Sequence, residues 1–128
     1  MATKNTALRN SQADSLVANL DSIELIDGGG TVIATGSGIS FAAASNGEVS
    51  PSSDVSITGN ASAGSGTDAD SARLFDSGGS GEEINSLNVT STVSGGGSLQ
   101  LDNTNVADGQ TITISASNFT ITEPASTQ

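Results

Sequence analysis

The stretch that most constrains the fold of this chain is residues 110–122, its longest run of alternating polar and apolar residues. Alternation with a period of two is typical of a half-buried β-strand. The apolar parity changes along the run, because Ile114 is even-numbered and Phe119 is odd-numbered. This change predicts one extra residue, a β-bulge, around residues 117–118. Pro124 cannot donate to a ladder and is expected to end the strand, which needs partners on both sides.

The rest of the chain contains many short segments that suit those partners. Residues 22–26 and 31–35 are apolar on alternate positions and flank a glycine-bearing loop, which predicts a hairpin. Asn46-Gly47 lies between residues 39–43 and a short strand at 48–50, and this dipeptide is a strong hairpin signal. Further strands are expected around four apolar clusters: Val55 and Ile57, Ala72 and Leu74, Ile84 to Val89, and Leu99 and Leu101.

One helix is expected, at residues 5–21. Its apolar residues repeat at helical spacing and form a single stripe: Ala13, Leu16, Val17 and Leu20. Asn5 or Thr6 is a suitable cap. The stripe is narrow, so two alternatives stay open: the helix covers its own β core, or it reaches a neighbouring subunit.

The number and spacing of the segments predict the fold class. Roughly eight or nine short strands at a spacing of about 8–12 residues suggest an antiparallel sandwich or barrel. We expect a mainly β protein, a single antiparallel β-sandwich, Ig-like or jelly-roll-like, with one N-terminal helix. The expected organisation is an arm and helix at 1–21, a sandwich domain at 22–124 and a short tail at 125–128. A chain of 128 residues fits one such domain.

Composition excludes several classes of function. The chain has three lysine and arginine residues and fourteen acidic residues, so its net charge is −11. No basic patch for nucleic acid is therefore expected. No run approaches the ~18 apolar residues of a membrane span, and the N-terminus lacks the apolar core of a signal peptide. Cysteine and histidine are absent. Disulfides, thiolate metal sites and the usual histidine-based nucleophile arrangements are therefore excluded.

The remaining candidates for chemistry are carboxylates. Three pairs could serve as an acid and a base: Asp68 with Asp70, Glu82 with Glu83, and Asp102 with Asp108. All lie in polar, glycine-rich turns without an aromatic platform for a sugar. Residues 67–71 also offer oxygen ligands two positions apart, but the closing glutamate of a calcium loop is missing. We expect no enzyme activity, no cofactor and no metal site, and whether calcium binds near Asp68 and Asp70 stays open.

Several segments of the chain form a recognisable set. They are Phe-Ala-Ala-Ala-Ser-Asn-Gly at 41–47, Ala-Arg-Leu-Phe-Asp-Ser at 72–77, Gly-Ser-Leu-Gln-Leu-Asp-Asn-Thr at 97–104, and Gly-Gln-Thr-Ile-Thr-Ile at 109–114 with Phe-Thr-Ile-Thr-Glu-Pro at 119–124. In these segments the chain resembles a family of small proteins encoded among the structural genes of tailed bacteriophages. The similarity covers most of the chain. It rests on residues that shape the fold and not on a catalytic signature.

The resemblance implies a virion component, with a capsid decoration or cement protein as the first expectation. Such a protein would bind the outside of the major capsid protein lattice, stabilise the head and form a homo-oligomer, for which we expect a trimer. It would be made in the host cytoplasm and reside on the capsid surface. Two alternatives stay open: a head-tail junction or tail protein of the same virion, and a carbohydrate-binding or adhesive sandwich.

Overall fold

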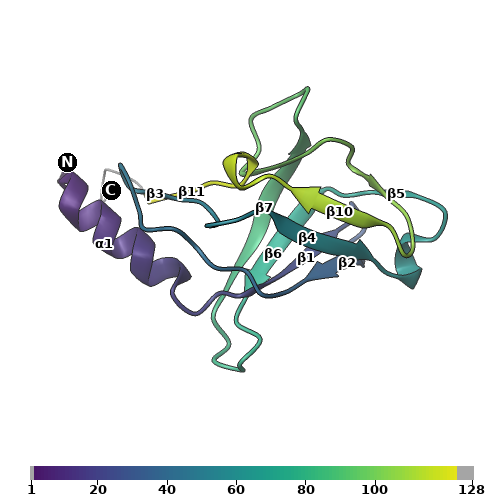
Figure 1. The fold of residues 1–128 in the computed structure, drawn as a ribbon, viewed down its shortest axis with the longest axis horizontal. Coiled ribbons are helices and arrows are strands. Elements are labelled where there is room, and N and C mark those ends of the chain that lie inside the picture. Colours follow the sequence, from purple (N-terminus) through teal and green to yellow (C-terminus); the bar gives the residue numbers. More distant parts are fainter. Residues whose placement is uncertain (1, 124–128) are drawn as a thin grey trace.

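A computed structural model describes residues 2–123. Helix α1 (Thr6–Val17) precedes all of the strands. The strands are β1 (Ser22–Ile26), β2 (Val32–Gly36), β3 (Glu48–Val49), β4 (Val55–Gly59), β5 (Thr67–Asp68), β6 (Ser71–Phe75), β7 (Glu83–Ser91), β8 (Leu99–Leu101), β9 (Asn105–Val106), β10 (Thr111–Ile114) and β11 (Ile121–Thr122). Two 3-10 turns, η1 (Ala61–Ala63) and η2 (Ala116–Asn118), interrupt them. The molecule is elongated, with α1 at one end, next to β3 and β11, and β5 toward the other (Figure 1).

One large sheet forms the body of the protein. Its seven strands lie in the order β10-β4-β2-β1-β6-β7-β8, and every pair is antiparallel except β7 with β8. The sheet curls until β8 approaches β10, so it is nearly closed into a barrel. Two short ladders, β11 with β3 and β5 with β9, lie outside it. The expected mainly β, largely antiparallel fold with one helix is confirmed, whereas the division into two sandwiched sheets is not.

The pairing of β7 with β8 differs from the antiparallel expectation. The two strands are parallel, with Val89 opposite Leu99 and Ser91 opposite Leu101. Parallel neighbours usually require a long crossover. Here the intervening glycines 95–97 fold the chain back on itself: Gly95 N donates to Ser91 O at 2.8 Å, and Gly97 N donates to Thr90 Oγ1 at 3.1 Å. Because the ladder is short, this brief connection is enough to bring β8 alongside β7.

The predicted long strand at 110–122 is two strands separated by a turn. β10 pairs with β4, the chain turns at η2, and β11 pairs with β3 in a different ladder. Asp54 Oδ1 accepts from Ala116 N at 3.0 Å where the ladder stops. The predicted β-bulge is therefore wrong, although the change of parity is confirmed, because Ile114 and Phe119 are both buried. Pro124 and the predicted tail lie outside the described residues.

The core is aliphatic and continuous from the sheet to the helix. Phe119 is its largest fully buried side chain, surrounded by isoleucine, leucine and valine. Ala13 and Val17 of α1 and the following Leu20 belong to the same buried cluster. The helix therefore covers its own β core, as one of the two alternatives held.

The helix begins where its sequence indicated and ends earlier. Asn5 is the N-cap, and its Oδ1 accepts from Leu8 N at 2.9 Å. The helix ends at Val17 instead of continuing to residue 21. Leu16, predicted to lie in the buried stripe, is 40% exposed. The hairpin of β1 and β2 is confirmed, with Asp27 Oδ1 accepting from Gly29 N and Thr31 N across the turn.

Candidate contact surface around helix α1

The Asn46-Gly47 turn lies against α1 and forms the two-residue hairpin that its sequence predicted. Ser45 and Glu48 exchange main-chain hydrogen bonds of 3.0 and 2.9 Å. Asn46 and Gly47 have φ values of 53° and 75°, the left-handed conformations that a type I′ turn requires. Before the turn, residues 39–43 follow an irregular path, and only Phe41 forms a bridge, with Pro51.

Polar side chains of α1 hold this turn. Asn10 Oδ1 accepts from Gly47 N at 2.7 Å, and Asp14 Oδ1 accepts from Ala44 N at 2.8 Å. Neither residue belongs to the apolar stripe of the helix. Their side chains satisfy main-chain donors of the turn that would otherwise need water.

The last described residue, Glu123, also contacts this region. Lys4 Nζ lies 2.6 Å from Glu123 Oε1, Arg9 Nε donates to Glu123 O at 3.2 Å, and Glu123 N donates to Gly47 O at 2.7 Å. Two of the three basic side chains thus pack where the first and last described segments meet. Sequence reasoning missed this meeting, because the residues concerned are more than a hundred positions apart.

The third basic side chain lies on the sheet. Arg73 pairs with Glu83 Oε2 at 2.6 Å and with Glu24 Oε1 at 3.3 Å, and its guanidinium carbon lies 4.2 Å from the centre of the Phe75 ring. All three of these partners lie on the sheet strands β1, β6 and β7. Each of the three basic residues of the chain therefore has a carboxylate or carbonyl partner within the protein.

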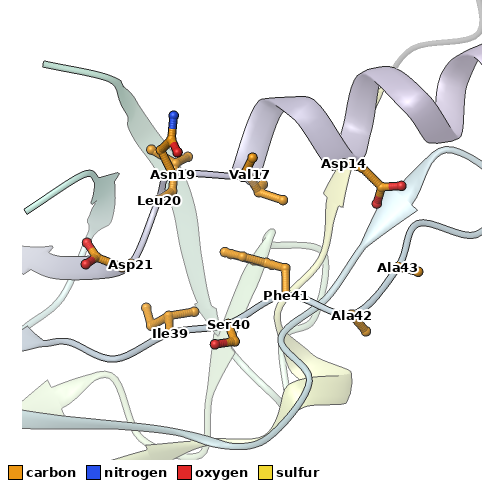
Figure 2. A pocket seen from close by; sticks show the side chains of 11 residues that line it. Asp14, Val17, Asn19, Leu20, Asp21, Ile39, Ser40, Phe41, Ala42 and Ala43 are labelled. Atoms are coloured by element: carbon orange, nitrogen blue, oxygen red, sulfur yellow. The ribbon is translucent and has the colours of Figure 1, made fainter. Parts of the chain in front are cut away.

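An open cleft of about 560 Å³ separates the C-terminal half of α1 from residues 39–43. Its apolar lining comes from Val17 and Leu20 on one side and Ile39 and Phe41 on the other, with Val17 pointing from the helix toward Phe41 (Figure 2). The ring of Phe41 meets that of Phe119 edge-on, with centroids 6.0 Å apart. Because Val17, Leu20 and Ile39 are almost fully buried, the cleft exposes mainly polar groups and lies directly over the core.

The acidic residues at the rim of the cleft already have partners. Asp14 accepts from Ala44 N, as described above. Asp21 accepts from Ser77 N at 2.9 Å and from the Ser77 hydroxyl at 2.8 Å, and these bonds lower the pKa of its carboxyl, the main-chain N–H most. A carboxylate held this way stays ionised and is poorly placed to take up a proton near neutral pH.

Helix α1 also carries exposed apolar side chains. Within residues 2–123, three large apolar side chains are exposed: Leu8 at 48%, Leu16 at 40% and Val93 at 93%. Two of them belong to α1. Leu16 and Leu20 also line a shallow groove of about 330 Å³ with residues 81–84, which include the partly buried Ile84. The helix therefore presents apolar groups on two sides while it covers its own core.

The predicted carboxylate pairs take separate structural partners. Glu82 accepts from Asn19 Nδ2 at 2.8 Å, while Glu83 binds Arg73 and Asn85, and the Asn85 amide, followed by Arg73, lowers the pKa of Glu83. Asp68 accepts from Asn105 Nδ2 at 3.2 Å.

The two residues of the third predicted carboxylate pair, Asp102 and Asp108, lie in different segments. Asp102 follows β8 and borders a small depression beside β10, and Asp108 lies in the turn before β10. In the part of the chain that the structure describes, no group of three or more acidic side chains is placed to hold a metal ion. The same residues include no helix long and apolar enough to cross a membrane.

Comparison of the chain with protein-family models, with curated proteins and with solved structures gives no match.

Proposed function

We propose that this chain is a non-enzymatic virion protein that decorates a bacteriophage capsid. In this role it binds the outside of the major capsid protein lattice and stabilises the head, as the family resemblance implies. The finer fold in this proposal is a flattened antiparallel sandwich, in which the curled sheet supplies both layers. Such a protein requires a compact body and a contact surface, and it requires no active site.

The observation that carries the proposal is the pair of exposed apolar side chains on α1. Leu8 and Leu16 are 48% and 40% exposed, and an open cleft lies beside the last turns of the helix. Apolar surface of this kind is a common feature of protein contacts. A capsid subunit that covered Leu8 and Leu16 would remove their remaining exposed surface from water. Because each side chain is already more than half buried, the gain is about half of the roughly 1.5–3 kcal/mol for burying a fully exposed leucine.

The position of α1 suggests an orientation of the molecule on the shell. Two exposed leucines lie on the helix, whereas β5 lies toward the opposite end of the molecule (Figure 1). We therefore propose that α1 faces the capsid and β5 faces solvent.

The test is the occupancy of purified virions by this chain and by a variant with Leu8→Ser and Leu16→Ser. The matched control is Gln12→Ser, an exposed position on α1 between the two leucines. We expect many copies on each head for the wild type and the control, and a loss of more than about tenfold for the double variant, given the apolar burial expected per leucine. Quantitative mass spectrometry and particle imaging measure both.

Three results would contradict the proposal in different ways. Unchanged occupancy of the double variant would remove α1 as the contact surface. A few copies at the tail would favour the head-tail junction or tail alternative. Absence of the chain from purified particles would exclude a virion role. Point substitutions are preferable to deleting residues 1–21, because Ala13, Val17 and Leu20 belong to the core and their loss would unfold the protein.

A further inference from the structure

Asn46-Gly47 is the one asparagine-glycine pair in the sequence. Asparagine in such a pair is chemically reactive. The main-chain nitrogen of the following residue attacks the side-chain carbonyl carbon Cγ, a new N–Cγ bond forms, and the C–N bond of the amide breaks with release of ammonia. Water then opens the resulting five-membered imide to aspartate or to isoaspartate. Glycine favours this reaction because it has no Cβ to hinder ring closure.

The structure places the two reacting groups in different environments. Asn46 is exposed, whereas Gly47 is buried against α1. Gly47 N donates to Asn10 Oδ1 at 2.7 Å, and Gly47 O accepts from Glu123 N at 2.7 Å. The hydrogen bonds between Ser45 and Glu48 close the turn from the other side.

These contacts oppose both requirements of ring closure. The Gly47 nitrogen must lose its proton before it attacks, and in the folded protein that proton lies in a short hydrogen bond to Asn10. A deprotonated nitrogen would face the lone pairs of the Asn10 oxygen, which is unfavourable. The nitrogen must also swing toward Cγ of Asn46, and the peptide groups on both sides of Gly47 are held.

We propose that Asn46 is a deamidation site controlled by α1. The site is protected while Asn10 holds the Gly47 N–H, and it reacts when the helix leaves the turn. The product gains a negative charge, and the isoaspartate form adds a methylene to the main chain of a two-residue turn. The Ser45–Glu48 bonds then no longer fit the turn, so the reaction weakens the docking of α1 irreversibly.

The experiment follows deamidation of the intact chain in mildly alkaline buffer by peptide mapping and mass spectrometry. Asn10→Ala should accelerate the reaction at Asn46 about fivefold, the factor that corresponds to one hydrogen bond of about 1 kcal/mol. Asn10→Asp, which keeps the acceptor oxygen, should restore a rate near that of the wild type. Asp14→Ala is the matched control, because it loses the bond to Ala44 and leaves the bond to Gly47.

A second measurement uses the wild type alone and does not depend on the folding of a variant. The rates at Asn46 and at the exposed Asn85 of Asn85-Ser86 are compared in buffer and in concentrated urea. We expect urea to accelerate Asn46 more than Asn85. Equal acceleration of the two sites, an unchanged rate in Asn10→Ala, or an equal effect of Asp14→Ala and Asn10→Ala would each overturn the proposal.

Discussion

The ammonium group of Lys4 lies 2.6 Å from the carboxylate of Glu123, although the two residues are 119 positions apart in the sequence. The Lys4 side chain is only 8% exposed and that of Glu123 18%. An ion pair shielded from water in this way is screened less than an exposed pair. Removing one partner is costly because it leaves the other charge poorly solvated. The contact joins the segment before α1 to the segment after β11.

Replacing one member of this pair should destabilise the protein. We expect Lys4→Met and Glu123→Gln each to lower the free energy of unfolding by about 1–3 kcal/mol, because each leaves a poorly solvated polar partner behind. The double variant should lose less than the sum of the two. Urea unfolding of all four proteins forms the double-mutant cycle, and strictly additive losses would show that the pair does not couple.

Truncating the core end of β10 should be costly. Ile114 is 1% exposed, so Ile114→Ala removes buried methyl and methylene groups and leaves a cavity. The expected loss is about 2–5 kcal/mol in urea unfolding. Thr113→Ala, at the neighbouring exposed position of the same strand, is the control and should change stability by less than ~0.5 kcal/mol. A loss near zero for Ile114→Ala would mean that the face of β10 is reversed.

A methyl group at Gly59 should disturb the end of β4. A Cβ built there would overlap the main-chain oxygen of Ala107 and also press on Val106. Main-chain atoms cannot rotate away, so Gly59→Ala should cost about 1–3 kcal/mol or more, by displacing the segment between β9 and β10. Gly28→Ala is the matched control, since nothing lies within 4 Å of its added Cβ. Thermal unfolding of both variants distinguishes a local clash from a general effect of adding a methyl group.

Acid should weaken the protein partly through Asp21. Hydrogen bonds from Ser77 lower the pKa of its carboxyl from the ordinary value of 3.8. A pKa that is lower in the folded state contributes stability above the unfolded-state pKa, and this contribution is lost as the pH falls through the folded-state pKa. Asp21→Asn should therefore reduce the loss of stability between neutral pH and pH values below 3.8. NMR titration that placed the Asp21 carboxyl at or above its ordinary pKa would contradict this account.

Local signals in the sequence predicted local structure well. The cap at Asn5, the hairpin of β1 and β2, and the Asn46-Gly47 turn each depend on residues within a few positions of one another. The burial of Ile114 and Phe119 followed from alternation alone, including the change of parity between them. These features are decided by steric and hydrogen-bonding preferences of short segments.

Predictions failed where two distant segments competed for the same residues. Continuous alternation at 110–122 suited one bulged strand, but Asp54 holds the Ala116 N–H and the chain turns toward β3 instead. Leu16 fitted the apolar stripe, yet the helix ends one residue later and the side chain stays partly in solvent. No residue near Ala116 indicates its contact with Asp54, and the apolar spacing around Leu16 does not indicate that the core leaves this side chain partly uncovered.

The sequence by itself determined the type of fold: a small acidic β protein with an aliphatic core, one capped helix and tight glycine turns. Only the tertiary structure decided the order of the strands, the parallel pairing of β7 with β8, and the docking of α1 through Asn10, Asp14 and Lys4. The physical reason is the distance along the chain over which each kind of interaction acts. Patterns of burial and turn formation act within a few residues, whereas ladder partners and ion pairs depend on which distant segments the packed core brings together.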